Sequence, residues 1–561
     1  MKAIKVEKTA SKGIAMGKAF LVRKPELKIS AGLIQEETIP DELKRYETAV
    51  GLAAAELEEL ARTSAIFGAH LEMVKDIALY ESVTAKIKSR YNAEAALMEA
   101  SAEFIQIFES MDDDYMRERA ADVKDVSYRL ICALQGVTAN PFEGIAKPVI
   151  LVAEDLTPSD TAKLDLKYVL GFITRDGGVT SHVSIMAKSL GLPALVGVKD
   201  ILKEVSEGDT VILDAGQGDI IINPREDVVE NYRNLKSAFE KRQSELAEMT
   251  GLPAVTRDGK EVLLCANAGN IKDIRNALQY NVDGIGLFRS EFLYMENSHF
   301  PTEEEQFLVY REAARLCGRE LTIRTLDIGG DKELPYYVFE KEENPFLGWR
   351  AIRISLELKD MFKTQLRAIL RASAFGHVRI MFPMIISLEE LRMAKAVAEE
   401  CKQELKKENI PFDEAIQLGM MIETPASVML AGKFAEEADF FSIGTNDLTQ
   451  YMLAVDRGNK KIAGLYNSFH PSVLHSIKQV IGAGHDKQIK VGMCGEFASD
   501  ERAVKLLLGL GLDEFSMSSA EIPNVKNIIR NTSYDEAVEL AEKALGQSTL
   551  ADIYGVLGIE V

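Results

Sequence analysis

The chain has 561 residues, of which 47% are apolar and 27% are charged, and this length allows roughly three or four domains with large cores. Its formal net charge of −21 argues against binding to nucleic acid or to an anionic membrane, because both need a basic surface. For the same reason, an anionic substrate would need a local cluster of Arg or Lys side chains.

The first half of the chain changes its hydrophobic pattern twice. Residues 1–22 alternate like strands, whereas from Pro40 to about residue 138 apolar residues recur at the three- and four-residue spacing of helices. Short apolar runs then return and predict strands, including a hairpin that ends near residue 223. We therefore expect an α/β domain built from residues 1–22 and 145–223, with a helical subdomain at residues 23–144.

The second half has the pattern of a barrel. Residues 224–251 predict one amphipathic linker helix, with Pro224 at its start, and a new domain follows at residues 252–561. In that domain helical stretches separate apolar strand-like runs at residues 261–269, 282–289, 321–329, 378–385, 416–424, 440–448, 489–496 and 514–518. Eight strand–helix units in about 300 residues are typical of a (β/α)8 TIM barrel, so we expect a multidomain α/β fold. A doubly wound sheet is the alternative.

The cysteines and the apolar segments indicate a cytoplasmic protein. The five cysteines are scattered without a Cys-x-x-Cys pair, which favours neither a disulfide framework nor a zinc site. No apolar core of signal-peptide length follows Met1, and no run of about 18 apolar residues occurs. We therefore expect no insertion into a membrane.

Polar residues end most of the predicted barrel strands, and the active site of such a barrel lies at the carboxyl ends of its strands. Each of these residues alone has an ordinary explanation, as a surface ion pair, a helix cap or a buried filler. Their joint occurrence favours a site. The residues are Arg289, Arg324, Glu423, Asn446, Asp447, Arg457 and Cys494.

These residue types fit one small, phosphorylated and multiply anionic ligand. Glu423 and Asp447 are hard oxygen donors that suit Mg²⁺. The arginine side chains offer planar forks for phosphate and carboxylate groups, and Asn446 adds a neutral donor. Cys494 could serve as an acid beside the ligand.

The most specific segment lies outside the predicted barrel, between Thr174 and Gly197. It leads from a strand through two glycines to His182, at or just before the first turn of a helix. Backbone N–H groups and the positive end of a helix favour a phosphate there. An imidazole nitrogen is a competent nucleophile for phosphorus, and the barrel would supply alignment and charge neutralisation.

In these motifs the sequence closely resembles enzyme I of the bacterial sugar phosphotransferase system, the phosphoenolpyruvate–protein phosphotransferase family. The resemblance spans the whole chain in order. It includes the Gly-Gly…Thr-Ser-His182 segment, Leu287-Phe-Arg-Ser-Glu-Phe-Leu-Tyr-Met, Arg324-Thr-Leu-Asp-Ile-Gly-Gly-Asp-Lys, Asn344-Pro-Phe-Leu-Gly-Trp-Arg350, Gly444-Thr-Asn-Asp-Leu and Gly492-Met-Cys-Gly-Glu.

The resemblance implies a role for each candidate residue. His182 would take the phosphoryl group of phosphoenolpyruvate on its Nε2, with Thr161 orienting the ring, and Cys494 would protonate the departing enolpyruvate. Glu423 and Asp447 would be the Mg²⁺ ligands. The clamp for phosphoenolpyruvate would consist of Arg289, Arg324, Arg350, Asn446 and Arg457.

The resemblance also implies partners. The acceptor would be a small histidine-containing phosphocarrier protein that serves sugar uptake. It would dock on the helical subdomain, with Phe67-Gly-Ala-His70-Leu as part of the docking surface. A homodimer through the barrels and a large swing of the His182 domain are further implications.

Three residues near His182 depart from the family pattern. Val179 and Lys188 stand where the family usually has Arg, and Val183 stands where a threonine or a small residue is commoner, although Arg175 is a nearby cation. These changes motivate one alternative, a regulatory paralogue of enzyme I with an altered acceptor. A less favoured alternative is a relative of the dikinases or phosphoenolpyruvate synthases, which carry a large nucleotide-binding domain; no Walker-type loop occurs here.

Overall fold

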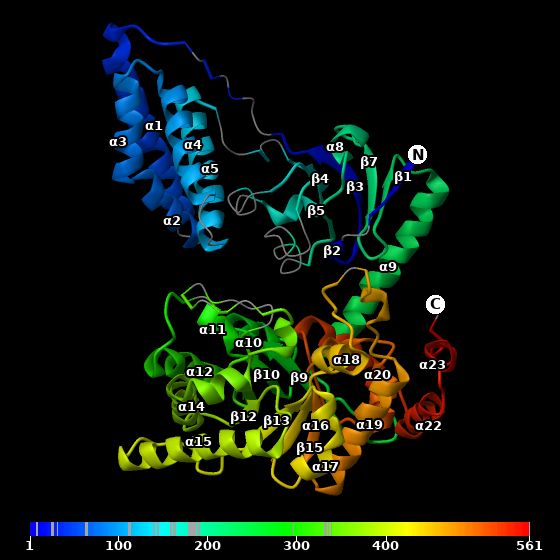
Figure 1. The fold of residues 1–561 in the computed structure, drawn as a ribbon. Coiled ribbons are helices and arrows are strands. Elements are labelled where there is room, and N and C mark those ends of the chain that lie inside the picture. The colour runs from blue at the N-terminus through cyan, green and yellow to red at the C-terminus, as the bar shows by residue number, and fades with distance from the viewer. Residues whose placement is uncertain are drawn as a thin grey trace. The chain divides into compact units, whose positions relative to one another are not determined.

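The structure is a computed structural model that divides into two compact units, Met1–Gln243 and Ser244–Val561 (Figure 1). It describes all residues except 7–8, 24–26, 28, 31, 62–64, 110–113, 138–140, 143–144, 157–159, 161–163, 178–183, 185–186, 188–190, 296, 330–333, 335, 338, 341, 460 and 560–561.

The first unit contains one sheet, in which eight strands of the described residues pair in the order β1-β8-β7-β3-β4-β5-β6-β2. Antiparallel β7 and β8 form the predicted hairpin, and β1–β3 join the sheet, so residues 1–22 contribute strands as expected. Alternate residues of β4 face two different cores, as the period of a strand requires. The strands are β1 (Lys2–Lys5), β2 (Thr9–Ser11), β3 (Ile14–Leu21), β4 (Val149–Ala153), β5 (Val169–Thr174), β6 (Ala194–Leu195), β7 (Thr210–Asp214) and β8 (Asp219–Ile222).

A helical bundle lies between β3 and β4 in the chain, and it confirms the helical pattern that begins at Pro40. One apolar stripe of each helix packs into a common core, where Leu57, Val83 and Leu97 are fully buried. Asp76 caps α3 by accepting a hydrogen bond from the Leu79 N–H. The helices are α1 (Ile39–Leu60), α2 (Ala65–Val74), α3 (Ile77–Lys88), α4 (Ala93–Glu109) and α5 (Asp114–Gln135), and a shorter α8 (Ile201–Glu204) precedes β7.

One expectation for this bundle is wrong. The resemblance places Phe67 and His70 in a docking surface, but their side chains are only 0% and 1% exposed. Phe67 packs in the core, and the His70 ring lies 3.1 Å from Asp122 Oδ1 and 3.5 Å from Asp125 Oδ2 on α5. Both side chains therefore hold α2 against the bundle, because their positions on α2 face the other helices rather than solvent.

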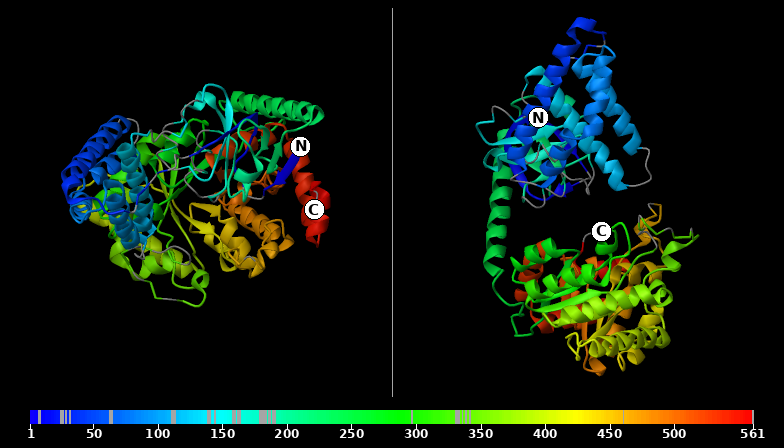
Figure 2. Two further views of the ribbon diagram at one scale, coloured as in Figure 1. Left: turned by 90° about the horizontal axis from the view of Figure 1, so that it is seen from above. Right: turned by 90° about the vertical axis from the view of Figure 1, so that its left-hand side faces the viewer.

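Helix α9 (Glu226–Met249) is the predicted amphipathic helix, and it begins two residues after Pro224 (Figure 2). The segment after α9 is fastened to α21 (Ile522–Arg530) by two hydrogen bonds. Lys526 Nζ donates to the Thr250 carbonyl at 2.8 Å, and Arg530 Nη1 donates to the Pro253 carbonyl at 2.7 Å.

The second unit contains the predicted (β/α)8 barrel. In its described residues eight parallel strands close into a ring, and each predicted apolar run holds one of them. The pairing of β16 with β9 completes the ring, which rules out the open doubly wound sheet. The strands are β9 (Leu263–Ala268), β10 (Gly284–Arg289), β11 (Glu320–Arg324), β12 (Val378–Phe382), β13 (Leu418–Ile422), β14 (Phe440–Ile443), β15 (Lys490–Met493) and β16 (Glu514–Met517).

Helices surround this barrel, as the right-hand view of Figure 2 shows, and their apolar side chains pack with those of the strands in one core. Inside the barrel Leu287, Met381, Met421 and Phe440 form a packed core, so a ligand can bind only at an end of the barrel. The helices are α10 (Ile271–Leu278), α11 (Glu291–Met295), α12 (Glu303–Cys317), α13 (Ile352–Glu357), α14 (Lys359–Ser373), α15 (Leu388–Lys407), α16 (Pro425–Met429), α17 (Ala431–Phe434), α18 (Thr445–Leu453), α19 (Pro471–Asp486), α20 (Val504–Leu510), α21, α22 (Tyr534–Leu545) and α23 (Leu550–Leu557).

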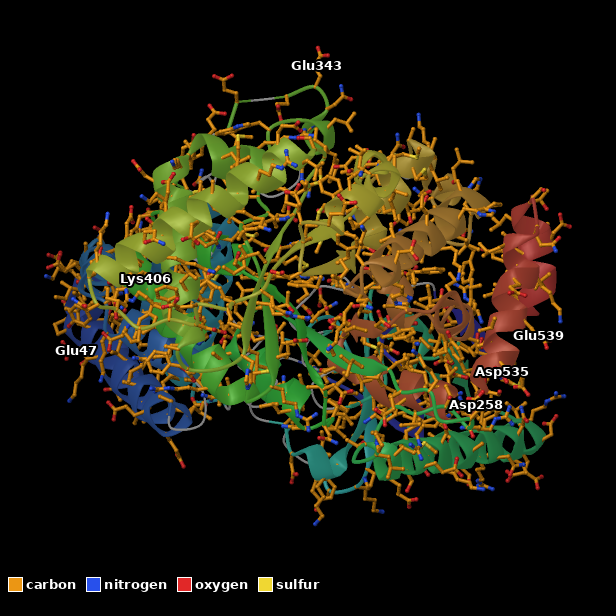
Figure 3. The ribbon with its side chains drawn as sticks, turned by 90° about the horizontal axis from the view of Figure 1, so that it is seen from below. Glu47, Asp258, Glu343, Lys406, Asp535 and Glu539 are labelled. Carbon is orange, nitrogen blue, oxygen red and sulfur yellow. The ribbon has the colours of Figure 1, made fainter. Side chains whose placement is uncertain are left out.

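The last helices are tied to the segment that enters the barrel. Figure 3 labels Asp258 and Asp535 close to each other at the start of α22. The Asp258 carboxylate accepts hydrogen bonds from the backbone N–H groups of Tyr534 and Asp535 and from Ser533 Oγ. Among the described residues, the helices are too short or too polar for any one of them to cross a lipid bilayer.

Candidate active site

The closed barrel brings the predicted site residues to one rim. Arg289 and Arg324 are the last residues of β10 and β11, and Glu423 directly follows β13. Asn446 and Asp447 lie in the first turn of α18, directly after β14, and Cys494 directly follows β15. Because all eight strands are parallel, these positions share the carboxyl-terminal mouth of the barrel.

A chain of alternating charges crosses this mouth. Arg324 Nη2 donates to Glu291 Oε1 at 2.5 Å, and Arg324 Nη1 lies 3.0 Å from Asp327 Oδ2. Arg350 Nη2 donates to Asp327 Oδ1 at 2.9 Å and to Asp447 Oδ2 at 3.2 Å. All five side chains are buried, so the surrounding protein dielectric strengthens each contact.

Arg457 completes the cluster from the loop after α18. Its Nη1 lies 3.1 Å from Asp447 Oδ1, so the two oxygens of Asp447 face two different arginines. The sequence did not predict these two ion pairs. They place Arg350 and Arg457 on either side of the Asp447 carboxylate. Two guanidinium forks separated by one small anion form a geometry that can also receive a phosphate group.

Glu423 is held beside Asp447 in a dry environment. Glu423 is 2% exposed, and its Oε1 accepts a 2.6 Å hydrogen bond from the Met384 N–H. Met384 takes a φ of 56°, a left-handed backbone conformation that is unusual for this residue type and common at functional sites. Gly444 leaves the space that Glu423 needs, because a Cβ at that position would come within 2.8 Å of Glu423 Oε2.

The electrostatics of Glu423 fit a cation. Burial, together with the negative charges of Asp447 and Asp327, raises the pKa of Glu423 to about 8. A cation between Glu423 and Asp447 would relieve this repulsion. Among the described residues no three His, Cys, Asp or Glu side chains are arranged to hold a metal alone. Two carboxylates fit Mg²⁺, which commonly takes its remaining ligands from water and substrate phosphate.

A cavity of about 380 Å³ opens beside this cluster. Arg289, Asn446 and Cys494 line it, together with Asn267 and Ser518 from the neighbouring loops. Arg289 is exposed there and Asn446 is half-buried, with Asn446 Oδ1 accepting from the Glu496 N–H at 3.2 Å. The cavity is therefore lined by three predicted site residues that take no part in the ion pairs described above.

The thiol of Cys494 is suited to hold a proton. Cys494 is 5% exposed, and burial raises its pKa to about 11. The thiol is therefore protonated at neutral pH and can donate a proton to a strong base in the cavity. Its backbone is fixed, because Asn267 Nδ2 donates to the Cys494 carbonyl at 3.1 Å and Ser516 Oγ donates to Asn267 Oδ1 at 2.7 Å.

Comparison with known proteins agrees with this chemistry. The family model described as PEP-utilising enzyme, PEP-binding domain, matches residues 243–534, more than half of the chain. The models for the N-terminal and the mobile domain of PEP-utilising enzymes match residues 8–119 and 145–218. The phosphoenolpyruvate-protein phosphotransferase of Haemophilus influenzae is 46% identical over 97% of this chain and 96% of its own length. The chain belongs to the phosphoenolpyruvate-protein phosphotransferase family.

Other relatives carry the same name. The phosphoenolpyruvate-protein phosphotransferase of Geobacillus stearothermophilus is also 46% identical, again over 97% of this chain and 96% of its own length. A solution structure of an enzyme I protein, nEIt, matches 42% of this chain and 100% of its own, with 37% identity and a TM-score of 0.39. Neither the regulatory paralogue nor the dikinase relative is favoured, because relatives named as the phosphotransferase match the chain almost from end to end.

Two predicted residues of this phosphotransferase lie outside the described residues, namely His182 and Thr161. The departures Val179, Val183 and Lys188 lie there too. Arg175 is described, and it forms ion pairs with Glu154 and Asp176. Its guanidinium is thus already engaged by two carboxylates, which speaks against Arg175 as the replacement for an arginine beside His182.

The sequence analysis missed several residues of the candidate site. Glu291 and Asp327 stand in the quoted motifs, but acidic residues were not expected among the ligands of an anion. Their role here is to hold Arg324 and Arg350 in place. Tyr451 accepts a 3.1 Å hydrogen bond from Arg350 Nη1, and only the three-dimensional structure reveals it. One signal in the sequence could have predicted the ion pair of Arg324 with Asp327, namely their separation by three residues directly after a strand.

Proposed function

We propose that this enzyme transfers the phosphoryl group of phosphoenolpyruvate to His182 and then to a small histidine-containing phosphocarrier protein for sugar uptake. The observation that carries the proposal is the convergence of Arg324, Arg350 and Arg457 with Glu423 and Asp447 at the barrel mouth. Such a site gathers arginine guanidinium groups around a site for a cation. This local positive charge can bind an anionic substrate that the net negative charge of the chain would otherwise repel.

In this proposal the clamp consists of Arg289, Arg324, Arg350, Asn446 and Arg457. The arginine forks hold the phosphoryl and carboxylate groups of phosphoenolpyruvate by paired hydrogen bonds. Glu423 and Asp447 hold Mg²⁺, which supplies charge neutralisation for the phosphoryl oxygens when bound. Thr161 orients the His182 ring, as the family resemblance implies.

The bond changes in the first transfer balance without a further reactant. His182 Nε2 attacks phosphorus as the bond from phosphorus to the enol oxygen breaks, and the enolate of pyruvate leaves. Cys494 then gives its thiol proton to C3 of the enolate, which forms pyruvate, and the thiolate regains a proton from water. The phosphoryl group finally passes from His182 to a histidine of the carrier.

We further propose the arrangement that the family resemblance implies. The His182-bearing domain comprises residues 1–22 and 145–223, the carrier binds the subdomain at 23–144, and residues 252–561 bind phosphoenolpyruvate and form a homodimer. A cytoplasmic location is supported by the five cysteines, which are all buried and form no disulfide.

The proposal is tested by incubating the purified protein with radiolabelled phosphoenolpyruvate and Mg²⁺. We expect acid-labile label on the chain, release of pyruvate, and transfer of the label to an added histidine phosphocarrier protein. Label from ATP rather than phosphoenolpyruvate would contradict the proposal. Label that stays on the chain with every carrier supplied would contradict the second transfer and favour a regulatory role.

The role of Cys494 gives a separate prediction. Cys494→Ala removes the proposed acid, so the rate of pyruvate formation should fall by about 10²- to 10⁴-fold, the usual contribution of such a group. Stopped-flow or quenched-flow measurements of pyruvate release would show this fall in rate. The affinity for phosphoenolpyruvate should stay nearly constant, because a thiol contributes little to anion binding.

Cys401→Ala is the matched control for this prediction. Cys401 is also buried, and burial raises its pKa to about 12, but it lies on α15 away from the mouth. Loss of a buried thiol therefore occurs in both variants, and only the Cys494 variant should lose the rate. Equal rates in the two variants would exclude Cys494 as the acid.

A further inference from the structure

The loop after β11 brings an aromatic ring to the arginines of the site. Its short helical turn, Pro345–Leu347, places the Phe346 ring 5.9 Å from Arg350 Cζ and 5.8 Å from Arg457 Cζ. Both distances lie within the range of about 6 Å over which a cation is attracted to an aromatic ring. Among the described contacts between a cation and a ring, Phe346 is the one ring that lies near both of these guanidinium groups.

The position of this ring is fixed by polar contacts of its own backbone. The Tyr451 hydroxyl donates a hydrogen bond to the Phe346 carbonyl and accepts one from Arg350 Nη1 at 3.1 Å. One turn further, Arg353 Nη1 donates to the carbonyls of Leu347 at 2.8 Å and Gly348 at 2.7 Å. The Phe346 backbone and the Arg350 fork are therefore connected through one hydroxyl group of α18.

The second neighbour of both arginines is Asp447, whose oxygens lie 3.2 Å from Arg350 Nη2 and 3.1 Å from Arg457 Nη1. In the proposed function Asp447 is a ligand of Mg²⁺, and a carboxylate shared with a cation attracts the two arginines less. The contact with Phe346 does not depend on the charge of Asp447. It therefore remains available to hold two like-charged groups near each other.

We infer that Phe346 is a positioning residue, which holds the guanidinium groups of Arg350 and Arg457 at the spacing that the phosphoryl group of the substrate requires. The inference rests on the proposed function, since it assumes that these arginines bind phosphoenolpyruvate. It concerns binding rather than the chemical step, because Phe346 has no polar side-chain atom to contribute to the reaction.

The chain provides its own probe for this inference. Trp349 is the only tryptophan of the sequence, and it directly precedes Arg350. Its Nε1 donates to Glu357 Oε2 at 2.7 Å, which holds the indole in one position. Titration of the Trp349 fluorescence with phosphoenolpyruvate and Mg²⁺ should therefore report binding at the mouth directly, in the full-length protein.

The central variant is Phe346→Leu, which keeps an apolar side chain but removes the aromatic face. We expect the dissociation constant and the KM for phosphoenolpyruvate to rise about tenfold, while kcat changes less than about threefold, because two ring–cation contacts are lost. Phe346→Tyr keeps the ring and should restore both constants to nearly the values of the unmodified protein. Leu347→Ala is the control in the same loop, since Leu347 is 64% exposed, and it should leave the dissociation constant unchanged.

Several results would overturn the inference. Phe346→Leu could bind phosphoenolpyruvate as tightly as the unmodified protein, or Phe346→Tyr could be as weak as Phe346→Leu; the ring face would then have no role. If Phe346→Leu does not fold, Tyr451→Phe replaces it, because it removes the hydroxyl between Phe346 and Arg350 and should also raise KM. An unmodified protein that fails to bind phosphoenolpyruvate would instead contradict the proposed function itself.

Discussion

Replacing His182 with alanine should abolish the transfer of label from phosphoenolpyruvate to the chain. The imidazole is the proposed nucleophile, and the methyl side chain of alanine cannot form a bond to phosphorus. Label measured on the protein after acid-free electrophoresis should fall to background, and pyruvate release should fall with it. Binding of phosphoenolpyruvate should persist, as read from Trp349 fluorescence, because the clamp residues belong to the barrel.

His299→Ala is the matched control for this prediction. His299 is 54% exposed and lies 3.5 Å from Glu305 Oε2 at the start of α12, so it has an ordinary surface role. This variant should accept label at the normal rate. Full labelling of His182→Ala would show that another residue is the acceptor, and loss of labelling in both variants would point to a general effect of the substitution.

The sequence predicted the barrel well because its strands are short and buried. Runs such as Leu418–Ile422 contain no polar residue, as expected for parallel strands that are covered on both faces. The spacing between runs then set the strand order, since consecutive units of a barrel are neighbours. The mouth followed, because residues such as Glu423 and Cys494 directly follow strands and a closed parallel barrel has a single carboxyl-terminal rim.

The pattern could not predict how the charges pair. Asp327 lies between Arg324 and Arg350, and the contact between Arg350 and Asp447 joins residues 97 positions apart. Such pairs depend on loop conformations after the strands, which local spacing does not determine. Phe67 is a different kind of error. The resemblance of a five-residue segment to the family suggested that this residue is exposed, whereas its position on α2 faces the core.

Glu423→Gln should have opposite effects on activity and on the stability of the metal-free protein. Phosphoryl transfer should fall by roughly 10³-fold or more, because the variant loses one of two proposed Mg²⁺ ligands and with it several kcal/mol of charge stabilisation. Stability should rise in the absence of metal. Folding buries a carboxylate beside Asp447 and Asp327, and a neutral amide removes that repulsion.

The pH dependence of this stability follows from the raised pKa. Folding raises the pKa of Glu423 from its usual 4.5 to about 8, so the folded protein keeps a proton that the unfolded chain has lost. The unmodified protein should therefore lose stability as pH rises from about 4.5 through about 8, when Mg²⁺ is removed by a chelator. Glu423→Gln does not titrate, so its advantage in thermal unfolding should grow over this interval and level off above pH 8.

Adding Mg²⁺ separates this account from a simple packing effect. The unmodified protein should become more stable, since a ligand that binds only the folded state stabilises it, whereas Glu423→Gln should respond weakly. Glu539→Gln is the control, because Glu539 is 72% exposed on α22 and should change neither activity nor the response to Mg²⁺. A Glu423→Gln protein that is less stable than the unmodified one at pH 9 without metal would contradict the raised pKa of Glu423. A Glu423→Gln protein that Mg²⁺ stabilises as much as the unmodified one would show that Glu423 and Asp447 do not form a cation site. The charge neutralisation that phosphoryl transfer needs would then have to come from the arginines.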